Sequence, residues 1–423
     1  MSETWSEQLK RVRAWHNQAD FSSAYDKRAA MCDLIMLCRR APESLLEAHR
    51  TAFDSDIQNS ADEFESALAR GKLTWQATGS DRELALTLAG LLRAIDANLI
   101  RTPEMLSSPS HAAAALVSKH DCYVIPRADA KSPNRPGPGN SFGRNGTPHF
   151  RILPRKIGTN QDYNVVPIWK PRLRLGRLAQ QTHDCIASLF PGMEVEFDRE
   201  RQDYLAVSAG GAKHDAQFLE QIRATFAQDT LAAVWPELCV PPDRLERLRS
   251  ELEKRALPLD PTRGPKLVAA GSWHVGEEGA RYSRMPVLDR FGSLILHYNK
   301  SIPFDVKGKR EAIVGDRDLQ ILVTPDAVVG FAICGDFSEL ELLLPYASLD
   351  LDLVLVASLA NPRTMRGHES NAERLADMWG TRVLVSQQQE PKGDHAGFVY
   401  PARVKGGHCR SNSAVNFRSI SFT

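Results

Sequence analysis

Three short stretches of the chain each place a reactive side chain directly after an apolar segment typical of a β-strand. Cys334 follows the segment 328–333, and Glu237 and Lys300 follow comparable segments. A thiol, a carboxylate and an ammonium group can supply a nucleophile, a proton acceptor and a cation that stabilises an oxyanion. In α/β folds the ends of strands are the usual place for ligand chemistry. The three side chains are therefore candidates for one active site.

Each of these residues also has a simpler interpretation. Cys334 could be a small buried apolar residue, as most free cysteines are. Glu237 could be an acid near a helix N-terminus, and Lys300 could be a solvated strand end. The glycine at 335 permits a sharp turn that can project the thiol into a cleft. The backbone N–H of Gly335 would then form half of an oxyanion hole. Taken singly, each residue still favours the simpler interpretation, and only the three taken together favour an enzyme.

The histidines compete poorly for a catalytic role. His297 and His368 could form a protease-like dyad with a cysteine, but no motif spacing supports one. His408 and Cys409 are adjacent and give no chelating geometry with other ligands, so the sequence predicts no metal site.

Composition limits the class of protein. The chain has 423 residues, 42% hydrophobic and 25% charged, with a formal net charge of +1. These values are typical of a globular protein with more than one domain and imply no membrane or nucleic-acid partner. Seven scattered cysteines without a CxxC pair indicate a reducing compartment. The first residues lack the apolar region of a signal peptide, so we expect a cytoplasmic protein.

The sequence divides into three regions. Residues 1–122 read as an all-helical domain and 123–160 as a Pro/Gly-rich linker. Residues 161–423 alternate strands and helices, which indicates an α/β domain. The segment 144–177 carries eight Lys or Arg residues against one acid, which favours a solvated face over a nucleotide or nucleic-acid site.

The helical domain carries recognisable start and core signals. Two stretches match the capping box that begins a helix: Ser60-Ala61-Asp62-Glu63 and Ser80-Asp81-Arg82-Glu83. Apolar residues follow the second box at helical spacing: Leu84, Leu88, Leu91, Leu92, Ile95 and Leu99. A further helix, with apolar residues at Met31, Leu34, Ile35 and Leu37, is expected to pack on this stripe.

Taken in order, the three reactive stretches resemble the signatures of the nitrilase superfamily, the carbon–nitrogen hydrolases. The stretches are Trp235-Pro236-Glu237, Tyr298-Asn299-Lys300 and Ile333-Cys334-Gly335-Asp336. The resemblance covers about residues 200–420. It implies a four-layer αββα sandwich, here preceded by the all-α domain. It also implies activity without a cofactor and assembly into homodimers or larger homo-oligomers.

The resemblance also implies roles for individual residues. Glu237 would be the general base and Cys334 the nucleophile that forms a thioester. Lys300 would stabilise the oxyanion together with the N–H of Gly335. Glu311 is the best candidate for the second glutamate that the family often adds.

The residues after the cysteine depart from true nitrilases, which carry Trp and Glu there. Gly335 and Asp336 imply the amidase or carbamoylase branch, and Ser338-Glu339 stands where the family has Pro-Glu. Amide or carbamoyl compounds are therefore the expected substrates. We expect Asp336, Glu339 and Asn361 to contribute to substrate binding.

Two other functions remain open. The chain could be a ligand- or nucleotide-sensing module that is catalytically silent or conditional, with the helical domain contacting a protein partner. It could also be a glutaminase that supplies ammonia to a partner enzyme, in which case glutamine would be the best substrate.

Overall fold

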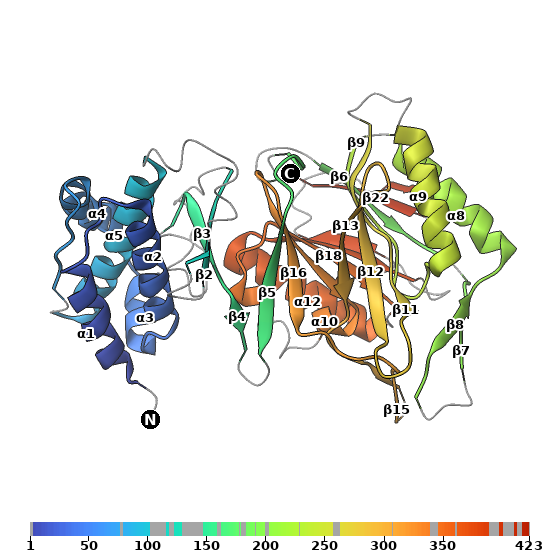
Figure 1. Ribbon diagram of the computed structural model, residues 1–423, viewed down its shortest axis with the longest axis horizontal. Helices are drawn as coiled ribbons and strands as arrows, with labels where there is room; N and C mark the ends of the chain where they lie inside the picture. Colours follow the sequence, from blue (N-terminus) through green and yellow to red (C-terminus); the bar gives the residue numbers. More distant parts are fainter. Residues whose placement is uncertain are drawn as a thin grey trace. The chain divides into compact units, whose positions relative to one another are not determined.

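The chain folds into two compact units in a computed structural model (Figure 1). Unit 1 comprises Met1–Lys156, Ser348–Asp350 and Asp377–Trp379, and unit 2 comprises the rest. The structure describes residues 3–76, 79–101, 116–117, 122–128, 147–158, 162–176, 178, 183–190, 192–198, 203–227, 229–256, 263–306, 308–338, 346–359, 362–388, 397–400, 410–412 and 417–422. No helix in these residues is long and apolar enough to cross a membrane.

Unit 1 is mainly helical. Its helices are α1 (Trp5–His16), α2 (Ala24–Arg39), α3 (Glu43–Arg50), α4 (Asp54–Ala69) and α5 (Asp81–Ile100). The predicted capping box at Ser80 is confirmed, because Ser80 Oγ accepts from the N–H of Glu83 and Glu83 Oε2 accepts from the N–H of Ser80. The apolar stripe of α5 is buried from Leu88 to Leu99 and packs against the buried residues of α2 in one core, as the spacing predicted.

The other predicted helix start, at Ser60, is wrong. The helix α4 begins at Asp54, and Asp54 and Asp56 lie in its first turn, where negative charge is favourable with the helix dipole. Ser60 lies inside the helix and faces Gly90 of α5. A Cβ atom at Gly90 would meet Ser60 Oγ at 2.4 Å. Glycine at this position therefore allows the close approach of α4 and α5.

Unit 1 also contains a small antiparallel sheet, so its described residues are not all-α. The sheet has the order β1 (Leu116–Val117), β2 (Cys122–Pro126) and β3 (Phe150–Pro154), and its last two strands lie almost wholly in the region predicted as a linker. Buried Asp96 of α5 accepts hydrogen bonds from the N–H groups of His149 and Phe150. This contact attaches β3 to the helical core, which local composition could not indicate.

Unit 2 contains two mixed sheets. In its described part the first sheet has the order β11-β12-β10-β9-β6-β22-β21, with β13 paired to β12. The second has the order β20-β19-β18-β17-β16-β5-β4. The strands of the first sheet are β6 (His183–Ser188), β9 (Asp229–Val234), β10 (Gly264–Ala269), β11 (Trp273–Val275), β12 (Tyr282–Asp289), β13 (Leu294–Asn299), β21 (Arg410–Asn412) and β22 (Phe417–Phe422). Those of the second are β4 (Lys156–Ile157), β5 (Tyr163–Trp169), β16 (Asp318–Val323), β17 (Val328–Ile333), β18 (Leu353–Ser358), β19 (Arg382–Gln387) and β20 (Gly397–Tyr400).

The two sheets share one apolar core. Side chains from β9, β10 and β12 of the first sheet form a single buried cluster with side chains from β17, β18 and β19 of the second. The helices α8 (Ala212–Thr225) and α9 (Pro242–Ala256) pack on the other face of the first sheet. The mixed α/β fold is as predicted. The complete four-layer sandwich stays a prediction, as do the domain boundaries and the linker.

Shorter elements surround the ends of these strands. Two small hairpins are formed by β7 (Val195–Phe197) with β8 (Ala206–Ala209) and by β14 (Asp305–Val306) with β15 (Lys309–Arg310). The helix α10 (Gly335–Ser338) follows β17, and α12 (Pro362–Trp379) follows β18. The strands β9, β13, β17 and β18 end just before Glu237, Lys300, Cys334 and Leu359, respectively. All four residues therefore lie just after the ends of strands.

Candidate active site

Cys334 lies in a constrained turn between β17 and α10. Its φ angle of +44° is in the left-handed region, which costs a non-glycine residue of order 1–3 kcal/mol. The adjacent strand holds it there, because the N–H of Cys334 donates to the carbonyl of Ala357 at 2.8 Å. The thiol is 4% exposed and donates to the carbonyl of Leu359 at 3.7 Å. Backbone strain of this kind is common at functional sites.

Glu237 is presented by the turn after β9. Its side chain is buried, and the neighbouring Trp235 is held by a hydrogen bond from its indole Nε1 to Gln221 Oε1 at 3.0 Å. The turn packs tightly against Gly271, where a Cβ atom would meet the carbonyl oxygen of Pro236 at 2.5 Å. The carboxylate accepts a hydrogen bond from the N–H of Leu359 at 3.1 Å. Leu359 therefore contacts both Glu237 and the thiol of Cys334.

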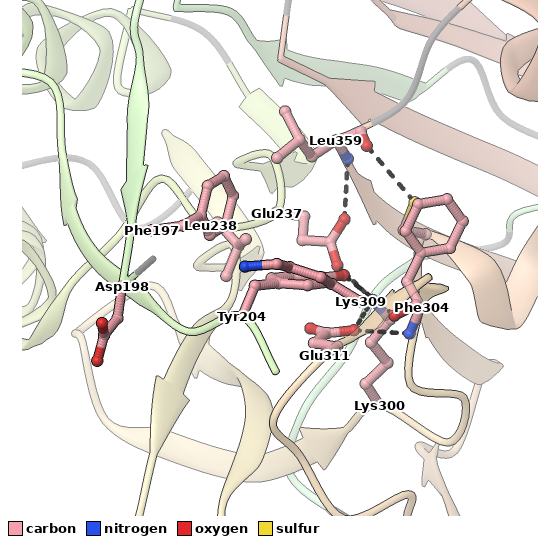
Figure 2. A pocket seen from close by; sticks show the side chains of 11 residues that line it. Phe197, Asp198, Tyr204, Glu237, Leu238, Lys300, Phe304, Lys309, Glu311 and Leu359 are labelled. Atoms are coloured by element: carbon pink, nitrogen blue, oxygen red, sulfur yellow. Dashed lines mark hydrogen bonds and ion pairs between the residues drawn. The ribbon is translucent and has the colours of Figure 1, made fainter. Parts of the chain in front are cut away.

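Lys300 lies between two carboxylates. Its Nζ donates to Glu237 Oε1 at 2.8 Å and to Glu311 Oε2 at 2.7 Å, and the residue is only 1% exposed (Figure 2). Burial alone would lower the pKa of Lys300, but the two carboxylates outweigh it and hold this pKa well above its usual value. The ammonium group is thus a fixed buried cation.

Glu311 is fixed by three donors. Besides Lys300, it accepts from the N–H of Phe304 at 3.0 Å and contacts His274 Nε2 at 2.9 Å. His274 Nδ1 accepts from the N–H of Ala206 at 2.9 Å, so Nε2 carries the ring proton and donates to Glu311. Although burial raises the pKa of Glu311, Lys300 and His274 together bring it down to about 2.

The thiol itself is protonated at rest. Burial raises the pKa of Cys334 to about 12, and the negative charge of Glu237 contributes in the same direction. Lys300 acts in the opposite direction. A thiol in this environment needs a base that removes its proton as the new bond forms.

These groups line one cavity of about 620 Å³. The reactive residues Glu237, Lys300, Glu311 and Cys334 occupy one part of its wall. Figure 2 shows Phe197 and Asp198 on the far side of the cavity from Lys300 and Glu311. The remaining lining residues are Tyr204, Leu238, Phe304, Lys309 and Leu359.

The structure brings together the predicted residues Glu237, Lys300, Cys334 and Glu311. Asp336 is buried and does not line the cavity. It accepts from the N–H groups of Ser301 and Ile302, each at 3.0 Å, and from the hydroxyl of Tyr298, and so anchors the segment that carries Lys300. Its role in substrate binding stays a prediction.

The structure describes only some of the other predicted residues. Gly335 is the first residue of α10, and its role in an oxyanion hole stays a prediction. Glu339 and Asn361 lie outside the described residues. His368 is buried and contacts Ser358 Oγ at 3.1 Å, so the structure gives it a partner other than a cysteine thiol.

Sequence reasoning missed several residues that shape the site. His274 lies in the short strand β11, and a histidine in an apolar strand was its only local signal. Leu359 contributes backbone groups, which carry no sequence signal. Phe197, Tyr204 and Phe304 reach the cavity from hairpins and loops whose positions depend on tertiary contacts.

The raised pKa gives a testable pH dependence. Because the pKa of Cys334 is about 12, the thiolate fraction should grow about tenfold per pH unit through the neutral and mildly alkaline range. We expect the logarithm of the rate of Cys334 alkylation by iodoacetamide, followed by mass spectrometry, to rise linearly from about pH 7 to pH 10. In the urea-unfolded chain the same rate should level off near the ordinary thiol pKa of about 8.5. A plateau below pH 8 in the folded protein would contradict the assignment.

Comparison with solved structures finds several proteins that are similar to part of this chain. A variant of the Nesterenkonia AN1 amidase, from the nitrilase superfamily, has 15% identity and a TM-score of 0.38 over 57% of this chain and 90% of that chain. Saccharomyces cerevisiae Nit3, a member of branch 10 of the same superfamily, has 16% identity and a TM-score of 0.38 over 53% and 84%. A glutamine-dependent NAD+ synthetase from Acinetobacter baumannii has 14% identity and a TM-score of 0.39 over 57% and 44%.

No protein-family model matches the chain, and no curated protein matches it in sequence. The similar amidase and Nit3 structures belong to the superfamily that the three sequence motifs resemble.

Proposed function

We propose that the chain is a thiol hydrolase that cleaves a non-peptide C–N bond in an amide-type small molecule. One observation carries this proposal: a buried Glu237–Lys300–Glu311 ion-pair network lines the same cavity as a cysteine held at positive φ. A buried network of this kind is costly to maintain and contributes little net stability, so a catalytic use explains it better than a structural one.

The first half-reaction forms a thioester. Glu237 accepts the thiol proton as Cys334 Sγ attacks the carbonyl carbon, and the carbonyl electrons move to oxygen. Lys300, whose side chain is buried, stabilises the oxyanion. When the oxyanion collapses, the C–N bond breaks and the leaving nitrogen takes the proton from Glu237. The products of this step are an acyl-thioester and ammonia or an amine.

The second half-reaction uses water. Glu237 accepts a proton from the water that attacks the thioester carbonyl, and Lys300 again stabilises the oxyanion. The C–S bond breaks, and the proton returns from Glu237 to the sulfur. The net reaction is amide plus water to carboxylic acid plus ammonia or amine. Glu311 and His274 act as positioning residues that hold the ammonium group of Lys300.

The test is a screen for ammonia or amine release from amides, carbamoyl compounds and nitriles. Turnover that Cys334→Ser abolishes and Cys185→Ala retains would support the proposal. Cys185 is a matched control because it is a buried thiol in β6, outside the cavity. Trapping of an acyl-enzyme on Cys334, seen as a mass increase, would identify the nucleophile. A complete absence of turnover across the screen would contradict the proposal and favour a sensing module.

Three further sequence predictions extend the proposal to the whole protein. We propose a cytoplasmic homodimer or larger homo-oligomer, with residues 1–122 available to a protein partner. Light scattering of the purified chain, with and without substrate, measures the oligomeric state.

A further inference from the structure

The part of the cavity wall that the reactive cluster does not supply is mostly apolar. Phe197, Tyr204, Leu238, Phe304 and Leu359 supply this part, and all five are large side chains. The rings of Phe197 and Tyr204 pack edge to face, with centroids 5.4 Å apart and planes at 87°. Such a pair forms a stiff surface for an apolar group.

The polar atom of Tyr204 is already engaged. Its hydroxyl donates to the carbonyl of Phe304 at 3.3 Å, so the ring also links two parts of the wall. Burial raises the pKa of Tyr204, which keeps the hydroxyl neutral at physiological pH. The ring therefore offers mainly carbon surface to a ligand.

The wall is attached directly to the reactive residues. The N–H of Tyr204 donates to the carbonyl of Arg310 at 3.0 Å, and the N–H of Ala312 donates to the carbonyl of Tyr204 at 3.0 Å. These two bonds flank Glu311. A further link runs from Ala206 of β8 through His274 to Glu311. Tyr204 is thus fixed relative to Lys300, and so is Phe197 through its pairing with Ala206.

Two charged residues also line the cavity, Asp198 and Lys309. Their opposite charges cancel in the net charge of this part of the wall. Figure 2 shows the Asp198 carboxylate well away from Glu237 and Glu311. The volume of about 620 Å³ lies in the range of pockets that bind drug-sized ligands, which is much more than a two-carbon amide fills.

We propose that this wall selects amides with a bulky apolar substituent, of the size of a phenyl or branched alkyl group. The inference rests on the proposed hydrolase function, because it names the substrate class of the same site. The apolar group packs against Phe197, Tyr204 and Phe304 while the amide carbon lies at Cys334. The substituent belongs to the acyl part or to the amine part of the substrate.

The experiment measures turnover by the wild type and, separately, binding to the Cys334→Ser variant. The probes are phenylacetamide, N-benzylacetamide, acetamide and glutamine. Wild type is assayed for kcat and KM, and Cys334→Ser is titrated calorimetrically with the same four compounds. We expect one or both benzyl compounds to exceed acetamide and glutamine by tenfold or more in kcat/KM, and to bind Cys334→Ser more tightly by a similar factor.

Variants of the wall test which residues select the substituent. Phe197→Ala and Phe304→Leu should each lower the preference for the benzyl compound over acetamide by about tenfold, through KM rather than kcat. Phe304 is 41% exposed, so its substitution opens no buried core and the variant should fold. Phe291→Ala is the matched control, because Phe291 is 50% exposed and does not line the cavity.

The outcomes distinguish failure of the substrate-class inference from failure of the proposed hydrolase function. If the kcat/KM for acetamide or glutamine equals that for the benzyl compounds, the inference is overturned and the hydrolase function stands. If nothing is turned over but Cys334→Ser binds a benzyl compound tenfold more tightly than acetamide, the inference stands and the hydrolase function fails. An unchanged preference in both wall variants would also overturn the inference.

Discussion

Replacing Lys300 by methionine is expected to lower the free energy of unfolding by about 3–5 kcal/mol. Methionine has a similar length, so it leaves little empty space, but it leaves the buried carboxylates of Glu237 and Glu311 without their shared cation. Breaking a buried ion pair by removing one partner costs this much because the remaining charge is unpaired in a poorly solvated site. Urea-induced unfolding, monitored by fluorescence and circular dichroism, measures the effect.

Lys309→Met is the matched control for this prediction. Lys309 lines the same cavity but is exposed to solvent. Its removal should change the free energy of unfolding by less than about 0.5 kcal/mol. If the two methionine variants lost equal stability, the Lys300 network would not be the buried ion-pair system described above.

The loss of unfolding free energy in Lys300→Met should also depend on pH, and the pKa of Glu311 sets the direction of that dependence. In the wild type the pKa of Glu311 is lowered from 4.5 to about 2, so its contribution is present above pH 4.5 and is lost as the pH falls towards 2. Lys300 is a main cause of that lowering, so the variant lacks this contribution. The difference in stability between wild type and Lys300→Met should therefore shrink as the pH falls from about 5 to 3.

Glu237→Gln is expected to lower kcat for amide hydrolysis by about 10²–10⁴-fold, the usual contribution of a general base. Glutamine preserves the shape of the side chain and an oxygen that can accept from the N–H of Leu359. It removes the capacity to accept the thiol proton. Glu277→Gln, an exposed acid in the same unit, is the control and should retain wild-type kcat.

In Glu237→Gln, Cys334 should react faster with iodoacetamide. Because the charge of Glu237 contributes to the raised pKa of Cys334, its removal should lower that pKa and increase the thiolate fraction at pH 8. Lys300→Met should have the opposite effect, because Lys300 lowers the pKa of Cys334. Slower hydrolysis together with faster alkylation in Glu237→Gln distinguishes loss of the base from general damage to the site. Equal losses in both reactions would contradict the effect of the Glu237 charge on the pKa of Cys334.

The helix starts show the limits of local sequence signals. Ser80 begins α5 because its capping partner Glu83 lies in the same turn and nothing else competes. Ser60 has the same local pattern but lies inside α4, where it faces Gly90 of α5. The strands β2 and β3 were hidden in a region rich in Pro and Gly, and their attachment depends on Asp96, more than fifty positions before β3.

The sequence by itself determined the strand ends at Glu237, Lys300 and Cys334, because apolar runs and the residues that end them are local properties. The family resemblance also predicted Glu311 as the second acid, through its position between two of the motifs. Only the tertiary structure decided that Lys300 joins both carboxylates and that Leu359 links Glu237 to the thiol. It also decided that His274 donates to Glu311 and that Phe197, Tyr204 and Phe304 line the cavity. These contacts join residues far apart in the chain through backbone groups and packing, and their distances are set by how the two sheets stack rather than by any local pattern.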